Sequence, residues 1–132
     1  MKPVFQTTFG VPHGNCFAAA VASILELDHI PDIDPSLPDE DEWRARWTTW
    51  FESRGYAWDA ITWDENWKYS PRGYSIANVE LRPGVMHAIV SHDGKPVHDP
   101  LPGQPFLKLS PDEQRKYQIT AYTRIYPKGT QV

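Results

Sequence analysis

The pattern of apolar and polar positions divides the chain into a helical first part and a strand-forming second part. An apolar run over 17–25 places its larger side chains at helical spacing. This spacing predicts a helix from Cys16 to Leu27, with Asn15 in a favourable position to cap its start. The run contains several alanines, which keep a helix thin enough to lie close against a sheet.

A second helix is predicted to begin near Asp39 and to end at Arg54 and Gly55. Asp39 and Glu42 have the spacing of a capping box. Four aromatic residues repeat at i, i+4, i+7 and i+8 and form one apolar stripe: Trp43, Trp47, Trp50 and Phe51. We interpret this stripe as part of the core rather than as a cage for a ligand.

After Gly55 the apolar positions change to the alternating pattern of β-strands. Ser110 and Glu113 form a capping box that predicts one or two helical turns between the later strands. The expected strands cover 56–63, 74–81, 85–92, 95–99 and 119–126. Helices followed by an antiparallel sheet predict an α+β fold, with the N-terminal helices packed on the sheet and residues 1–132 in a single domain.

Composition and charge exclude several classes of function. The chain has 132 residues, is 40% hydrophobic and carries a net charge of −4 without a cluster of Lys or Arg, which argues against nucleic-acid binding. No apolar run is long enough to span a membrane, and 1–10 lacks the pattern of a signal peptide. A single cysteine forms no internal disulfide, so we expect a cytoplasmic protein. The acidic, proline-rich stretch 32–42 is expected to be a solvated loop.

Cys16 is the first candidate for chemistry, because it is predicted to occupy the first position of a helix. The free backbone N–H groups and the helix dipole there favour a thiolate over a thiol. The same N–H groups can stabilise an oxyanion on an attacked carbonyl. A small buried hydrophobic residue is the alternative for a lone cysteine beside an alanine-rich helix.

A thiol nucleophile needs a base and a group that orients the base. His87 lies within an apolar predicted strand, where an imidazole requires a polar partner. A three-residue loop over 92–94 would pair Ser91 with Lys95 and place His87 directly opposite Asp99 on one face of the hairpin. We therefore predict this loop, and with it the triad Cys16, His87 and Asp99. The alternatives are a hydrogen-bonded core histidine and an Asp-Pro turn.

Several blocks of the chain resemble small papain-like cysteine peptidase-type proteins of bacteriophages and bacteria, a group related to the leader peptidases of bacteriocin exporters. The first block is the run Gly-Asn-Cys-Phe-Ala-Ala over 14–19, which continues to Ile30-Pro31. The second comprises Pro-Arg-Gly at 71–73, His-Ala-Ile-Val at 87–90, Asp-Gly at 93–94 and Val-His-Asp-Pro at 97–100. Together they cover about 16–31 and 70–100.

The resemblance implies a papain-like fold and a catalytic order of Cys, His and Asp along the chain, which Cys16, His87 and Asp99 follow. It also implies a glutamine upstream of the cysteine as an oxyanion donor. Gln6 is the only upstream glutamine and lies ten residues away, a longer gap than is usual, so Asn15 or another N–H group is an alternative donor.

The resulting expectation is a monomeric cysteine hydrolase, a peptidase or amidase acting on a peptide or amide substrate, without cofactor or metal. If the chain is phage-encoded, it would act in the host cytoplasm. A non-catalytic papain-like protein that binds a host factor and a thiol acyltransferase are the alternative functions.

Three further features leave alternatives open. A zinc site built from Cys16 and His87, His92 and His98 is disfavoured, because the three histidines do not share one face of a hairpin. His98 is expected to face away from Asp99 as a structural or substrate-rim residue. Ordinary packing is favoured over a substrate cleft for the aromatic residues of one long loop: Trp58, Trp63, Trp67 and Tyr69.

Overall fold

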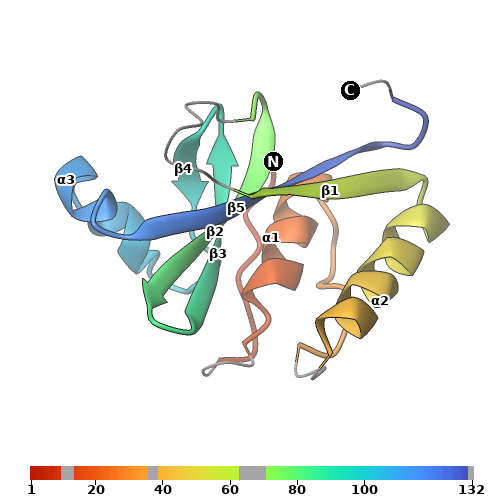
Figure 1. Cartoon of the computed structure of the whole chain (residues 1–132), viewed down its shortest axis with the longest axis horizontal. Helices are drawn as coiled ribbons and strands as arrows, with labels where there is room; N and C mark the ends of the chain where they lie inside the picture. Colours follow the sequence, from red (N-terminus) through yellow and green to blue (C-terminus); the bar gives the residue numbers. More distant parts are fainter. Residues whose placement is uncertain (10–13, 36–38, 63–70, 131–132) are drawn as a thin grey trace.

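In the computed structural model, two helices pack on one face of a five-stranded antiparallel sheet, which confirms the predicted α+β class (Figure 1). The structure describes residues 1–9, 14–35, 39–62 and 71–130. The elements are α1 (Cys16–Leu25), α2 (Glu40–Ser53), β1 (Tyr56–Thr62), β2 (Tyr74–Arg82), β3 (Val85–His92), β4 (Lys95–His98), the 3-10 helix η1 (Pro105–Lys108), α3 (Pro111–Gln114) and β5 (Gln118–Pro127).

The strand order is β1-β5-β2-β3-β4, so the last strand of the chain lies between the first two. β5 pairs with β1 along seven positions and with β2 on its other side. Strands β2, β3 and β4 follow one another as a meander. This order leaves β4 as a short edge strand beside β3.

Helix α1 begins at Cys16, as predicted, and ends two residues earlier than expected. It ends because Glu26 adopts a left-handed conformation, with φ of 55°, and its N–H group bonds back to the last turn. Asn15 occupies the N-cap position without a side-chain hydrogen bond to the helix, so the expected cap is absent.

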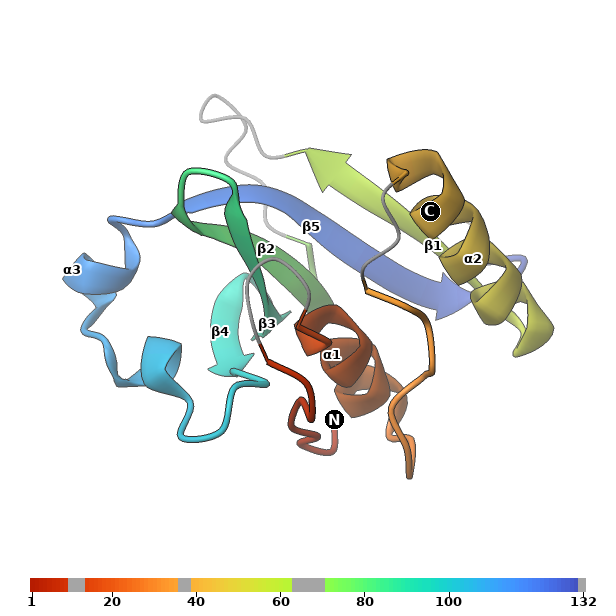
Figure 2. The same ribbon diagram turned by 90° about the horizontal axis from the view of Figure 1, so that it is seen from below.

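Helix α2 lies beside α1, and both cover the same face of the sheet (Figure 2). The Asp39 side chain caps α2 by accepting from the N–H of Asp41 rather than through a capping box with Glu42. Trp47 and Phe51 are buried against α1 and the sheet, whereas Trp43 and Trp50 are only half-buried. Trp43 and Trp50 pack against this core from their half-buried positions, so the interpretation of the stripe as part of the core is confirmed.

The opposite face of the sheet carries a second, smaller core. Phe106 of η1 packs there against Ala77, Val79 and Ile89. The capping box of α3 is present as predicted, with reciprocal bonds between Ser110 and Glu113. Figure 1 shows α3 beyond this side of the sheet, away from α1 and α2.

The turn between β3 and β4 differs from the predicted one. His92 pairs with Lys95, so the connection is the two-residue turn Asp93-Gly94 and the three-residue loop is wrong. Both turn residues have positive φ, 52° and 81°, as in the type I′ turn whose twist suits a hairpin. Asp93 is held in this conformation because its side chain and N–H group bond to the backbone of Gly73.

A bulge later in β4 nevertheless places Asp99 on the same face of the sheet as His87, as the predicted loop would have done. Ser91 pairs with Pro96 but Val90 pairs with His98, so Val97 is an extra residue. One position further along, the register places Asp99 beside Ile89, which shares a face with His87. The side chains of His87 and Asp99 therefore meet on one face, as predicted, but the bulge rather than the turn sets this register.

The helices are short. α1 has 10 residues and α2 has 14. No helix in the described part of the chain is both long enough and apolar enough to cross a membrane.

The packing predicts which tryptophan the fold requires. Trp47→Ala removes a side chain that is 1% exposed between α1 and α2, and we expect it to lower the free energy of unfolding by about 3–5 kcal/mol. Thr49→Ala, at an exposed position of the same helix, should change it by less than about 0.5 kcal/mol. Urea denaturation followed by tryptophan fluorescence measures both, and equal effects would contradict this packing.

Candidate active site

Cys16 occupies the first position of α1, where the backbone N–H groups have no partner within the helix. Its half-buried side chain hydrogen-bonds to the imidazole of His87. The backbone N–H groups of Phe17 and Ala88 also donate to the sulfur. The thiol therefore lies where a negative charge is stabilised from three directions.

The short length of β4 makes room for this arrangement. The pairing of β4 with β3 ends at Val90. The earlier part of β3, over 85–89, therefore has no β4 partner, and α1 contacts β3. The N–H of Ala88 lies on this segment and contributes to lowering the pKa of the Cys16 thiol. The sulfur thus occupies the edge of the sheet next to His87.

His87 and Asp99 form a buried ion pair. Nε2 of His87 lies 2.6 Å from Oδ1 of Asp99, which leaves Nδ1 as the nitrogen for Cys16. The Asp99 carboxylate is 0% exposed and accepts two more hydrogen bonds, from the N–H groups of Leu101 and Phe106. These bonds fix the carboxylate, which in turn fixes the ring.

The three ionisable groups perturb one another. Burial alone would raise the pKa of the Cys16 thiol, but the hydrogen bond and charge of His87, with the two backbone N–H groups, lower it below its ordinary value. Burial opposes the charged form of His87, yet its bonds to Asp99 and Cys16 raise its pKa to about 9. Burial likewise opposes ionisation of Asp99, and its hydrogen bonds lower its pKa despite this. Each of these two side chains therefore favours the charged form of the other, a thiolate beside an imidazolium.

Gln6 lies at the site despite its distance from Cys16 in the sequence. It is 7% exposed and lines the same cavity as Cys16, His87 and Asp99. Its Nε2 donates one hydrogen to the carbonyl of Thr8 and keeps a second available. Its Oε1 is buried and has no hydrogen-bond partner among the described residues.

Asn15, the other candidate oxyanion donor, is occupied elsewhere. Its Oδ1 accepts from the N–H groups of Thr7 and Thr8, and its Nδ2 donates to Oγ1 of Thr7. These bonds attach the N-terminal segment to the start of α1. The side chain of Asn15 thus has a structural task in this arrangement.

The sequence analysis did not predict the contacts of the N-terminal segment 2–8, which has no helix or strand. The segment runs between α1 and the end of β4. On one side, Oγ of Ser23 accepts from the N–H of Val4 and donates to its carbonyl. On the other, Gln6 N–H donates to the carbonyl of Pro100. Ser23 interrupts the apolar run of α1, and this was the one signal of the contact in the sequence.

His98 is a buried structural residue rather than a residue of the substrate rim. It is 1% exposed, and its Nε2 donates to the carbonyl of Val4 at 2.8 Å. Its Nδ1 lies 3.2 Å from Oε1 of Gln104, which also accepts from the N–H of Asp99. His98 and Gln104 therefore join the N-terminal segment to the loop that holds Asp99.

Two cavities meet at the thiol. One, of about 360 Å³, lies between α1, α2 and the sheet, and includes Trp43 and Trp58 in its wall. The other, of about 370 Å³, lies beside Gln6 and Asp99. Trp58, assigned to ordinary packing, thus also faces the site, whereas Trp63, Trp67 and Tyr69 lie outside the described residues.

The residues considered for a zinc site do not form a cluster of metal ligands in the described part of the chain. Over the described ranges, no group of three His, Cys, Asp or Glu side chains is arranged to hold a metal ion. His92 is exposed and contacts Asp93 at the turn, far along β3 from the thiol. The three histidines considered for zinc do not converge on Cys16.

The electrostatics predict a reactive thiol at acidic pH. At about pH 6 we expect iodoacetamide to alkylate Cys16 about tenfold or more faster than it alkylates free cysteine. The reactivity should persist through neutral pH and change its pH dependence near pH 9, where His87 loses its proton. Mass spectrometry over a pH series measures this without ambiguity, because the chain has one cysteine.

His87→Ala removes the imidazolium that lowers the thiol pKa, so its alkylation profile should shift to higher pH. His92→Ala, an exposed histidine on the same strand, is the matched control and should leave the profile in place. A profile that is the same with and without His87 would refute the coupling.

Comparison with known proteins gives no match to a family model, to a curated protein or to a solved structure. The site brings together Cys16, His87, Asp99 and Gln6, whereas the side chain of Asn15 bonds to the N-terminal segment.

Proposed function

We propose that this chain is a cysteine-dependent hydrolase, a peptidase or amidase of papain-like type. The observation that carries the proposal is the continuous hydrogen-bonded series from Cys16 through His87 to the buried carboxylate of Asp99. The series starts at a helix N-terminus and lies beside two cavities. The chain order Cys, His, Asp and the packing of helices on an antiparallel sheet support the papain-like assignment.

Acylation follows from the positions of these groups. The Cys16 thiolate attacks the carbonyl carbon of an amide, and the carbonyl oxygen becomes an oxyanion. N–H groups at the start of α1 and the free hydrogen on Nε2 of Gln6 stabilise it. The C–N bond then breaks, and the proton on Nδ1 of His87 goes to the leaving amine. The product is a thioester on Cys16 and a neutral imidazole.

Deacylation reverses the role of the imidazole. Neutral His87 removes a proton from water, and the resulting hydroxide attacks the thioester carbonyl. The C–S bond breaks, which releases a carboxylic acid and restores the thiolate beside the imidazolium. Asp99 keeps Nε2 protonated and the ring oriented throughout, so that Nδ1 alone exchanges protons.

The triad makes a quantitative prediction for hydrolysis. With a mixture of fluorogenic peptides, Cys16→Ser should reduce kcat/KM by at least about 10³-fold, because a hydroxyl is much less acidic than this thiol. His87→Ala should reduce it about 10²–10⁴-fold, the usual contribution of a general acid and base. Asp99→Asn should reduce kcat/KM by a factor in the same range, with a smaller change in KM than in kcat.

Turnover must also depend on Gln6 if its amide binds the oxyanion. Gln6→Met, which has no N–H group in its side chain and adds no charge, should lower kcat about 10²-fold, whereas alkylation of Cys16 by iodoacetamide stays close to wild type. A rapidly alkylated Cys16 with no hydrolysis of any peptide or amide would instead support a non-catalytic binding protein or an acyltransferase.

A further inference from the structure

The two cavities at the thiol differ in their walls, and they share four residues: Gly14, Cys16, Met86 and His87. Since both cavities include the nucleophile and its base in their walls, a carbonyl bound at Cys16 lies next to both. We name them the aromatic cavity, of about 360 Å³, and the aliphatic cavity, of about 370 Å³.

The aromatic cavity is enclosed by rings from three elements. Phe17 follows Cys16 on α1, and its ring centroid lies 5.0 Å from those of Trp43 and Trp47 on α2. Trp58 of β1 closes the wall 6.1 Å from Trp43. Trp43, Trp58 and Phe17 are half-buried, so the cavity presents their ring surfaces rather than hiding them in the core.

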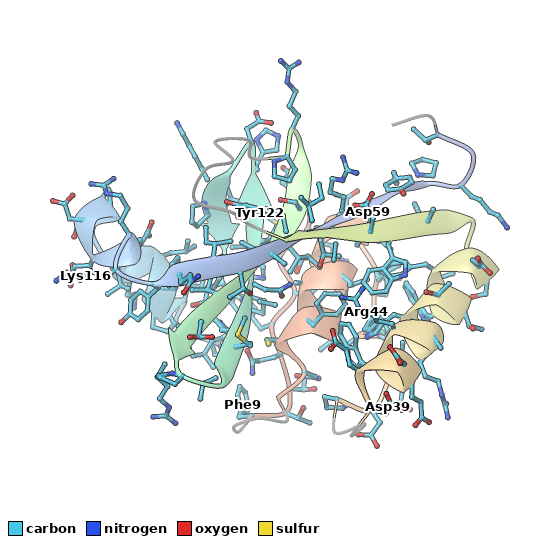
Figure 3. All side chains as sticks on the ribbon, viewed as in Figure 1. Phe9, Asp39, Arg44, Asp59, Lys116 and Tyr122 are labelled. Carbon is cyan, nitrogen blue, oxygen red and sulfur yellow. The ribbon has the colours of Figure 1, made fainter. Side chains whose placement is uncertain are left out.

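The charged groups of the aromatic cavity are already paired. Arg44 bonds to Glu40 at 3.4 Å, and its guanidinium lies over the ring of Trp58 at 5.9 Å. Figure 3 shows Arg44 on α2 on the side of the helix that faces α1. A charged substrate group would find no free counter-charge among the described residues of this wall.

The aliphatic cavity lies beneath the turn between β2 and β3, and Figure 3 shows Phe9 at this end of the molecule. Apart from the three site residues Cys16, His87 and Asp99, none of its described lining residues is charged. Its apolar wall is mixed: the aliphatic side chains that give the cavity its name are Leu81, Val85, Leu101 and Leu109, and the rings of Phe9, Phe106 and Tyr117 line it as well.

Exposed apolar side chains gather at the mouth of the aliphatic cavity. Phe9 is 58% exposed, Met86 45% and Leu81 39%, and all three line it. Apolar surface left in water is a free-energy cost that a bound apolar group removes. Exposed apolar residues beside a reactive thiol are the surface expected where a substrate docks.

We propose that the substrate is an extended, uncharged polypeptide segment with a large apolar side chain on each side of the scissile carbonyl, one of them in the aromatic cavity. This rests on the proposed hydrolase function. Two cavities with the thiol between them suit a chain that continues in both directions, whereas a single acyl chain would fill one. Because such segments are buried in folded proteins, the enzyme acts on unfolded or flexible regions.

Alkylation by substituted iodoacetamides tests the two cavities without requiring turnover. Four reagents carry N-benzyl, N-3-methylbutyl, N-dodecyl and N-carboxymethyl groups, and each rate is divided by the rate of the same reagent with free cysteine. We expect the benzyl and methylbutyl reagents to modify wild-type Cys16 about tenfold faster than the carboxymethyl reagent.

Substitutions in each cavity test which cavity binds the benzyl group and which binds the methylbutyl group. Trp43→Ala should reduce the benzyl preference to about a third or less, whereas Trp50→Ala should retain it, because Trp50 is a half-buried residue of the same helix outside both cavities. Leu81→Asp should remove the methylbutyl preference. Tyr74→Asp, at a position 40% exposed on the same strand, is its control. Thermal unfolding verifies that each variant is folded.

The outcomes separate the two proposals. If unsubstituted iodoacetamide reacts no faster with Cys16 than with free cysteine, the hydrolase proposal fails. If iodoacetamide reacts rapidly but the carboxymethyl reagent is as fast as the benzyl and methylbutyl reagents, the substrate proposal alone is overturned. A rate for the dodecyl reagent far above all others would overturn it in favour of a lipid acyl group. Equal effects of Trp43→Ala and Trp50→Ala would remove the assignment to the aromatic cavity.

Discussion

The carboxylate of Asp99 is fully enclosed by protein and carries a negative charge, so its hydrogen bonds must replace the water that it lost. His87, Leu101 and Phe106 supply three donors, and the loop after β4 is shaped around them. This buried charge holds a proton on His87, and the charged imidazole in turn stabilises the thiolate of Cys16. The reactive state of the thiol thus depends on a carboxylate with which it has no direct contact.

The N-terminal segment joins the helix that carries Cys16 to the loop that carries Asp99. Its contacts with Ser23 attach it to the helix that carries the thiol, and its contacts with His98 and Pro100 attach it to the loop that carries Asp99. Gln6 makes one of these attachments through its own N–H group, which explains how a glutamine ten residues from Cys16 reaches the same cavity. A buried histidine held at both ring nitrogens is well suited to such a connection, because it bridges two backbone segments at a fixed distance.

The aromatic stripe of α2 serves the core and the site at once. Trp47 and Phe51 fill the space between α2, α1 and the sheet, and Trp43, one turn earlier, extends the same ring cluster to the cavity beside Cys16. The helix therefore positions the cavity wall through the packing that stabilises the fold. Paired charges at the rim, Arg44 with Glu40, leave that wall without net charge.

Local patterns were sufficient for much of the molecule, because helix caps, apolar periodicity and turn residues act over a few neighbours. They placed Cys16 at a helix start, predicted β3 over 85–92 and predicted the capping box of Ser110. They also indicated which three residues form the site. The turn at Asp93 was mispredicted, because the three-residue loop was inferred from the need to place Asp99 on the face of His87, and the bulge at Val97 meets this need instead.

Tertiary structure alone decided the features that depend on contacts distant in sequence. The insertion of β5 between β1 and β2, the bulge at Val97 and the path of segment 2–8 each follow from such pairings. The sequence by itself determined which three residues form the candidate site and which elements lead to them. Only the folded chain decided the register that brings His87 to Asp99, because one inserted residue in a strand exchanges its two faces and no local preference records the choice.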